Sequence, residues 1–157
     1  MQESGDRIAF CRSGKRIAVG CEDGSVVVME GSNFETRFKL EGHKAAIAWC
    51  CFLPDGNLLT GESTNHITKR WSMETHSEIP TGEDFPYFAQ TPVVDGNCIV
   101  GIHWNSYFPL KVFFYDVVQD KIVKAFHIAT RHDAFLSGSG GLVALLWSEA
   151  LFWTLSG

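Results

Sequence analysis

A polar turn that ends in glycine recurs along this chain about every 40 to 45 residues, a period typical of repeated units of four short strands. The repeated glycines are Gly14, Gly56, Gly96 and Gly140. A unit of this size cannot bury its apolar faces alone, so successive units must pack on one another. The period therefore restricts the chain to a repetitive architecture before any single residue is interpreted.

Each glycine turn is followed by two apolar runs that are typical of β-strands. The first run contains a small residue, and the second ends at a large side chain. Residues 26–29 are apolar at consecutive positions, which indicates a strand that is covered on both faces. In the second unit we expect strands near residues 46–53, 58–61, 67–72 and 78–79. The large side chains that end the second runs are Met29, Trp71, Tyr115 and Trp153.

Residues 19–30 resemble, without a gap, the WD-repeat family's stretch Ser-Gly-Ser-Asp-Asp-Gly-Thr-Ile-Arg-Ile-Trp-Asp. Gly42-His43 matches the family's Gly-His pair, and Trp71 stands where its tryptophan is expected. The other units are degenerate, and none closes with Trp-Asp itself. The resemblance implies an all-β fold, a β-propeller of about four WD-repeat-like blades that form part of a seven- or eight-bladed ring.

We expect one WD-repeat-like propeller region over residues 1–157, with repeats at about 1–41, 42–81, 82–126 and 127–157. Four units are about half of a usual ring, so two blades would present an apolar face without a neighbour. Three alternatives follow from this count. The chain is a piece of a longer protein, another copy or chain closes the ring, or the four units form a small closed propeller.

His43, Thr60 and Trp71 resemble three members of the hydrogen-bonded tetrad of this family. The resemblance implies that the histidine bridges a strand hydroxyl and a turn aspartate, while the tryptophan completes the chain of bonds. Asn65 or Thr64 stands where that aspartate is expected. We therefore predict a structural tetrad of His43, Thr60, Asn65 and Trp71.

The aligned aspartate of the first repeat is Asp23, but its histidine partner is absent. A histidine beside a threonine also raises the question of nucleophilic catalysis, which needs an exposed nucleophile and a base held by a third group. The repeat gives each residue a structural reason, and buried polar groups must find partners. We therefore expect no catalytic residue.

Two aromatic segments are candidate surfaces for partner binding. Residues 102–110 are unusually aromatic for a connection between strands, and they either pack over the blade edge or form a recognition loop. Residues 82–91 form a second candidate near the entrance of the third unit. The candidate partner-binding residues are Trp104, Tyr107, Phe108, Phe85 and Tyr87.

The net charge of −5 is spread over interspersed acids and bases without a basic block, which argues against direct nucleic-acid binding. The most apolar stretch, residues 140–155, is shorter than a membrane span, so we expect no membrane insertion. The start of the chain does not resemble a signal peptide.

The five cysteines are odd in number and lie mostly in or beside apolar strands. None is spaced as Cys-x-x-Cys, and Cys50 and Cys51 would point to opposite faces of a strand, so we expect no metal site. Free thiols favour a reducing compartment, the cytoplasm or the nucleus.

The resemblance implies a non-catalytic scaffold for protein–protein interaction, as a subunit or fragment of a larger complex. We expect protein or peptide partners, with self-association or a partner chain completing the propeller, and no cofactor. The alternative is a propeller-type enzyme or small-ligand binder that uses the central channel. A fold alone does not decide between these functions.

Overall fold

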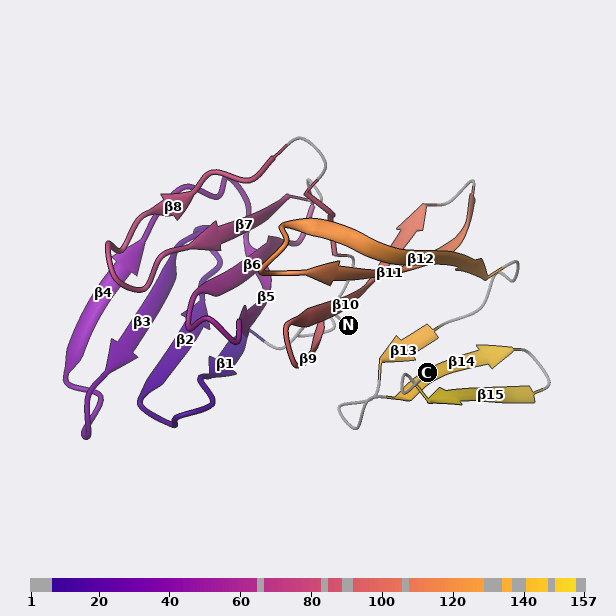
Figure 1. The fold of residues 1–157 in the computed structure, drawn as a ribbon. Coiled ribbons are helices and arrows are strands. Elements are labelled where there is room, and N and C mark those ends of the chain that lie inside the picture. Colours follow the sequence, from indigo (N-terminus) through magenta and orange to yellow (C-terminus); the bar gives the residue numbers. More distant parts are fainter. Residues whose placement is uncertain are drawn as a thin grey trace. The chain divides into compact units, whose positions relative to one another are not determined.

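The computed structural model describes residues 7–64, 67–82, 85–88, 92–105, 108–128, 134–136, 141–146 and 149–154. Every regular element of these residues is a β-strand, and all strand pairs are antiparallel, as the all-β prediction requires (Figure 1). The chain divides into two compact units, residues 1–91 and residues 92–157, which are described separately.

The first unit contains two four-stranded sheets whose strands follow one another in chain order. The strands of the second sheet lie close to the four positions predicted from the sequence, which confirms that prediction. The first sheet consists of β1 (Ile8–Phe10), β2 (Arg16–Gly20), β3 (Val26–Glu30) and β4 (Thr36–Leu40). The second consists of β5 (Ile47–Phe52), β6 (Leu58–Glu62), β7 (Thr68–Trp71) and β8 (Glu78–Ile79).

The second unit contains one four-stranded sheet and one three-stranded sheet, again in chain order. The third sheet consists of β9 (Val93–Asp95), β10 (Cys98–Asn105), β11 (Phe108–Asp116) and β12 (Lys121–Ile128). The described strands of the fourth are β13 (Ala134–Leu136), β14 (Gly141–Leu146) and β15 (Glu149–Thr154). Meanders of this kind resemble propeller blades.

The two sheets of the first unit pack face to face. The small residues Ala9 and Ala18 of the first sheet share a core with Ile47, Leu58 and Trp71 of the second. The sheets approach closely, because a side chain at Gly20 would overlap Ile47. The small residue at this point of the repeat is therefore a packing requirement.

The opposite face of the first sheet is open. Ile8 and Phe10 on β1 are 53% and 67% exposed, whereas Ala9 between them is buried. By strand register, Ile8 pairs with Val19 and Phe10 with Ile17, so these four apolar side chains share the open face. Ile8 and Phe10 are exposed, whereas Ile17 and Val19 beside them are half-buried.

Residues 102–110 are not the connection that the sequence suggested. β10 continues to Asn105 and β11 begins at Phe108, so most of this segment is paired strand. The two strands are eight and nine residues long, against five for β2 and β3. Trp104 and Phe108 lie in the paired strands of a long hairpin, where large side chains are well accommodated.

Three residues other than glycine have positive φ angles in the described chain, namely Phe34 (54°), His76 (56°) and Asp120 (53°). Each lies in the turn between the third and fourth strands of its sheet, at the same distance from the large side chain that ends the third-strand pattern (29 to 34, 71 to 76 and 115 to 120). His76 stacks on Phe38 with ring centroids 3.7 Å apart, and the Tyr115 hydroxyl donates to Asp120. The three repeats thus share a left-handed backbone conformation at this turn, although that conformation is unfavourable for residues other than glycine.

We predict that Gly61→Ala destabilises the protein by about 1–3 kcal/mol, the usual cost of overpacking. Gly61 pairs with Trp49 across β5 and β6, and an added methyl group would overlap the indole ring. The control is Gly82→Ala, since a methyl group there meets nothing within 4 Å. Urea denaturation measures both, and equal midpoints for the two variants would contradict the packing explanation.

Candidate functional site

The best-defined polar cluster of the chain lies in the second sheet. His43 comes from the connection between β4 and β5, while Thr60 and Glu62 lie two residues apart on β6 and therefore share a face. Trp71 ends β7, which pairs with β6. The strand register thus brings together side chains from three separate segments.

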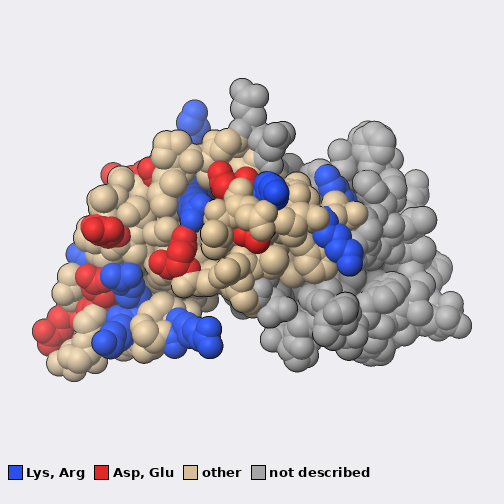
Figure 2. All heavy atoms as spheres, in the orientation of Figure 1, with Lys and Arg blue, Asp and Glu red and all other residues tan. Residues whose placement is uncertain are grey.

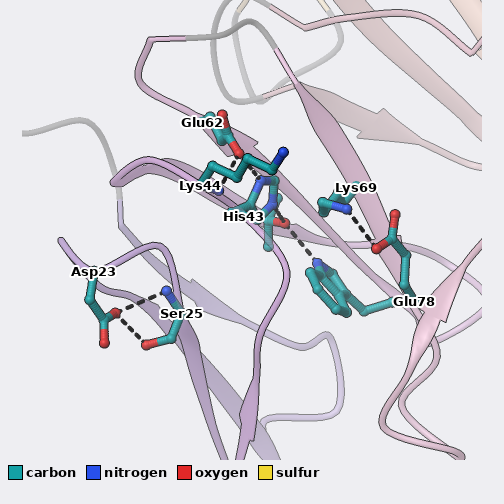
Figure 3. Close-up of polar contacts among 9 residues, drawn as sticks. Asp23, Ser25, His43, Lys44, Glu62, Lys69 and Glu78 are labelled. Atoms are coloured by element: carbon teal, nitrogen blue, oxygen red, sulfur yellow. Dashed lines mark hydrogen bonds and ion pairs between the residues drawn. The ribbon is translucent and has the colours of Figure 1, made fainter.

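Hydrogen bonds join these residues in one chain (Figure 3). Trp71 Nε1 lies 2.8 Å from Thr60 Oγ1, which lies 2.6 Å from His43 Nε2. His43 Nδ1 lies 3.0 Å from Glu62 Oε1. The backbone amide of Lys44 donates to the same carboxylate oxygen at 2.8 Å. The side chains of His43 and Glu62 have no exposed surface.

The donor and acceptor roles in this chain follow from the carboxylate at one end and the tryptophan at the other. A carboxylate can only accept, so His43 Nδ1 carries the proton that is donated to Glu62. An indole N–H can only donate, so Thr60 Oγ1 accepts from Trp71. In the neutral ring His43 Nε2 is then an acceptor, and the Thr60 hydroxyl donates to it.

Burial lowers the pKa of His43, and the nearby Glu62 carboxylate opposes this shift without reversing it. Protonation would make Nε2 a donor as well, so the Thr60 hydroxyl would lose the ring nitrogen as the acceptor of its own hydrogen. The hydrogen-bond pattern and the lowered pKa agree on a neutral histidine.

Thr60 has no accessible surface, so its hydroxyl cannot meet a substrate in this conformation. A nucleophile must be exposed in a cleft. The chemical role of this arrangement is to satisfy buried polar groups. It also attaches the segment that precedes β5 to the strands β6 and β7. Lys69 and Glu78, paired at 2.6 Å, lie beside it, with the Lys69 ammonium 6.0 Å from the Trp71 ring centroid.

The structure brings His43, Thr60 and Trp71 together, whereas the carboxylate partner of His43 is Glu62. Thr64 is exposed, and Asn65 lies outside the described residues. Glu62 was missed because the resemblance directs attention to the turn after β6. The alternation of side chains along a strand would have indicated Glu62, because residues two apart, such as Thr60 and Glu62, lie on the same face.

Asp23 of the first sheet has a local role. It accepts hydrogen bonds from the hydroxyl and the backbone amide of Ser25, at 2.5 and 2.9 Å (Figure 3). These bonds, with a contribution from Lys39, lower the pKa of Asp23 to about 2. The carboxylate therefore holds the turn between β2 and β3.

The aromatic candidates fall into two groups. Phe85 and Tyr87 are half-buried, and Phe85 packs edge to face on Phe88, with centroids 6.3 Å apart. Burial raises the pKa of Tyr87. Trp104 and Phe108 lie in β10 and β11, and Tyr107 lies outside the described residues. Their role in partner binding stays a prediction.

All five cysteines are free thiols. Burial raises the pKa values of Cys50 and Cys51 to about 12, so both thiols are protonated and unreactive. In the described part of the chain, no three side chains of the ligand types could hold a metal ion. Nor does any helix among the described residues have the length and apolar character to cross a membrane.

We predict that His43→Ala destabilises the protein by about 1–3 kcal/mol, because Glu62 and Thr60 would each lose a buried partner. Thr60→Val, which keeps the shape but removes the hydroxyl, should act in the same direction. Lys44→Ala is the matched neighbour, since the bond to Glu62 uses only the Lys44 backbone. If thermal unfolding gave His43→Ala and Lys44→Ala the same stability, the structural role would be wrong.

We also predict that stability falls at acid pH through His43. Its folded-state pKa lies below its ordinary value of 6.5, so beneath that pH the unfolded state binds a proton that the folded state does not. The contribution is complete above about pH 6.5 and is lost as the pH decreases further. Urea denaturation between pH 7.5 and 5.5 should show a larger loss for wild type than for His43→Ala. Nitrogen NMR should show the Nδ1–H form, and an Nε2–H signal would contradict the assigned bonds.

Comparison with known proteins gives a family match over one repeat and a similar fold. A solved chain titled Kuenenia stuttgartiensis Hydrazine Synthase aligns with a TM-score of 0.61 and 15% identity. The alignment covers 87% of this chain but only 42% of that one, and at such identity it shows the fold alone. No curated protein matches the sequence.

The family described as "WD domain, G-beta repeat" matches residues 34–72. That segment contains all four residues of the hydrogen-bonded chain, His43, Thr60, Glu62 and Trp71. The match confirms the family predicted from the Gly-His pair and the tryptophan, and it supports a WD-repeat family for this chain.

Proposed function

We propose that this chain is a non-catalytic scaffold for protein–protein interaction, built from WD-repeat blades. WD repeats in general suggest such a role, and domains of this type are typically not enzymes. The observation that carries the proposal is the buried chain from Trp71 to Glu62. The polar side chains of the matched repeat bond to one another, which leaves strands and loops as the surface offered to partners.

The open face of the first sheet supports a finer proposal, that these blades are part of a larger propeller. Ile8 and Phe10 are among the most exposed apolar side chains of the described residues, and they lie beside the apolar Ile17 and Val19. Each Å² of apolar surface left in water forgoes about 25 cal/mol. Another blade, from a second copy, a partner chain or a longer form of this protein, would cover this face.

The charge distribution favours a protein partner over nucleic acid. Acidic and basic side chains are interspersed on the face of the first unit in view (Figure 2). The net charge is −5. Binding to a phosphate backbone needs a basic stripe, whereas a protein partner can match mixed charges. The free thiols suit a reducing compartment, so we include the cytoplasm or nucleus in the proposal.

The aromatic residues Trp104, Tyr107 and Phe108 remain proposed contacts, with Phe85 and Tyr87 as a second group. Aromatic anchors dominate binding energy in many interfaces. The placement of Trp104 and Phe108 in paired strands supports this proposal, because residues already ordered in a sheet lose less entropy on binding than residues of a free loop.

Association of the chain tests the proposal. We predict that the purified protein self-associates or binds a partner chain, and that Phe10→Lys weakens this association by placing a charge on the open face. Val118→Lys is the control, since Val118 is 75% exposed in the turn after β11. Sedimentation velocity measures the mass of each variant alone and with a partner candidate.

A monodisperse monomer that unfolds cooperatively, binds no protein and is unaffected by Phe10→Lys would contradict the open ring. Equal loss of association in Phe10→Lys and Val118→Lys would contradict the role of this face.

A further inference from the structure

The outer edge of β12 is a long and exposed strand edge. The third sheet has the order β12-β11-β10-β9, so β12 has a hydrogen-bonded neighbour on one side only. It is eight residues long, against five for β4 and two for β8, the corresponding outer strands. All five side chains described in β12, at positions 121–125, are exposed. Long edges of this kind can pair with another strand.

A β-bulge sets the pattern of side chains along this edge. Tyr115 pairs with Ile122, but the next residue back, Phe114, pairs with Lys124. Val123 is therefore an extra residue in β12, with no opposite number in β11. In a regular strand, residues 121 and 124 would point to opposite faces, because their separation is odd.

The bulge changes this outcome and places both lysines on one face. Lys121 pairs with Asp116 and Lys124 pairs with Phe114. Asp116 and Phe114 are two residues apart on β11, so they share a face, and their partners share it with them. The opposite face of the edge carries Ile122.

The two faces of the edge differ in chemistry. Ile122 and Val123 are 37% and 45% exposed, which is high for β-branched apolar side chains in a strand. Neither Lys121 nor Lys124 forms a salt bridge with a carboxylate among the described residues. Lys124 Nζ lies 5.8 Å from the Phe114 ring centroid, and the charge of Lys121 contributes to the lowered pKa of Asp116. The Asp116 carboxylate accepts instead from the backbone amides that follow it. The edge therefore presents two cations on one face and the apolar Ile122 on the other, and the bulged Val123 adds a further exposed apolar side chain.

A second copy of this chain fits the edge poorly. Antiparallel pairing of two β12 strands would set the lysine faces side by side, and like charges on adjacent strands destabilise a sheet. The positive charges of Lys121 and Lys124 are complementary instead to a partner strand that places carboxylates beside them. Its alternate residues must be apolar to cover Ile122 on the opposite face.

We propose that the outer edge of β12 binds an extended segment of a partner protein in which acidic and apolar residues alternate. The segment adds a fifth strand to the third sheet, with main-chain hydrogen bonds for affinity and the two faces for selectivity. This proposal rests on the scaffold function and names the chemistry of one partner.

The probe is an eight-residue peptide of alternating glutamate and valine, equal in length to β12. Fluorescence anisotropy measures its binding to the full chain. Two further peptides carry N-methyl groups on every valine or on every glutamate. In an extended strand alternate amides point to opposite edges, so one methylated peptide should lose binding and the other should keep it.

The charge of the edge is tested by the double variant Lys121→Glu, Lys124→Glu, which should bind the peptide about tenfold or more weakly. The control is Lys15→Glu, Arg37→Glu, which makes the same change in net charge at two exposed cations of the first unit. Circular dichroism and urea denaturation establish that both variants fold as wild type does.

Three outcomes would overturn the proposal. The peptide fails to bind wild type, the two methylated peptides bind equally, or the edge variant binds as well as the control. Self-association that is abolished by Val123→Pro but not by the peptide would assign the edge to a second copy. None of these results affects the association expected at Phe10, so the scaffold function is tested independently.

Discussion

The hydrogen bonds around His43 are the constraint on which the rest of the first unit depends. They hold the segment that precedes β5 against β6 and β7. The backbone of this same segment meets the first sheet, since a side chain at Gly24 would overlap the carbonyls of His43 and Ala45. A few residues later, the Ile47 amide donates to the Cys21 carbonyl at 3.1 Å. One buried polar cluster thus fixes the segment through which the two sheets of this unit make contact.

Close approach is the second condition, and small residues meet it. Gly20 admits Ile47 from the neighbouring sheet, while Gly61 admits the indole of Trp49 from the adjacent strand. Both glycines lie near the end of the second strand of a sheet, Gly20 as the last residue of β2 and Gly61 as the next-to-last residue of β6. A glycine there therefore serves packing between sheets in one case and packing within a sheet in the other. This difference is one way in which degenerate repeats keep a common backbone with different side chains.

The repeat period and the alternation of apolar runs were sufficient to predict the strands of the second sheet and the family. They could not identify Glu62, because the resemblance places the carboxylate in a turn, whereas β6 carries it on the face of Thr60. The hairpin at residues 102–110 was misread for a related reason. Its strands are longer than those of the other repeats, and a repeat period cannot predict where one repeat differs in length from the rest. The extra residue at Val123 was equally invisible, since a bulge is defined by the pairing of two strands.

Phe34, His76 and Asp120 hold one left-handed backbone conformation at equivalent turns, each with a different side chain. Glycine would adopt that conformation without strain, yet it would remove the ring stack between His76 and Phe38 or the bond between Tyr115 and Asp120. The chain therefore contains an internal series in which the same torsional cost is offset by an imidazole stack in one repeat and by a phenol–carboxylate bond in another. At these turns the three sheets share one backbone conformation and differ in the local chemistry that makes it tolerable.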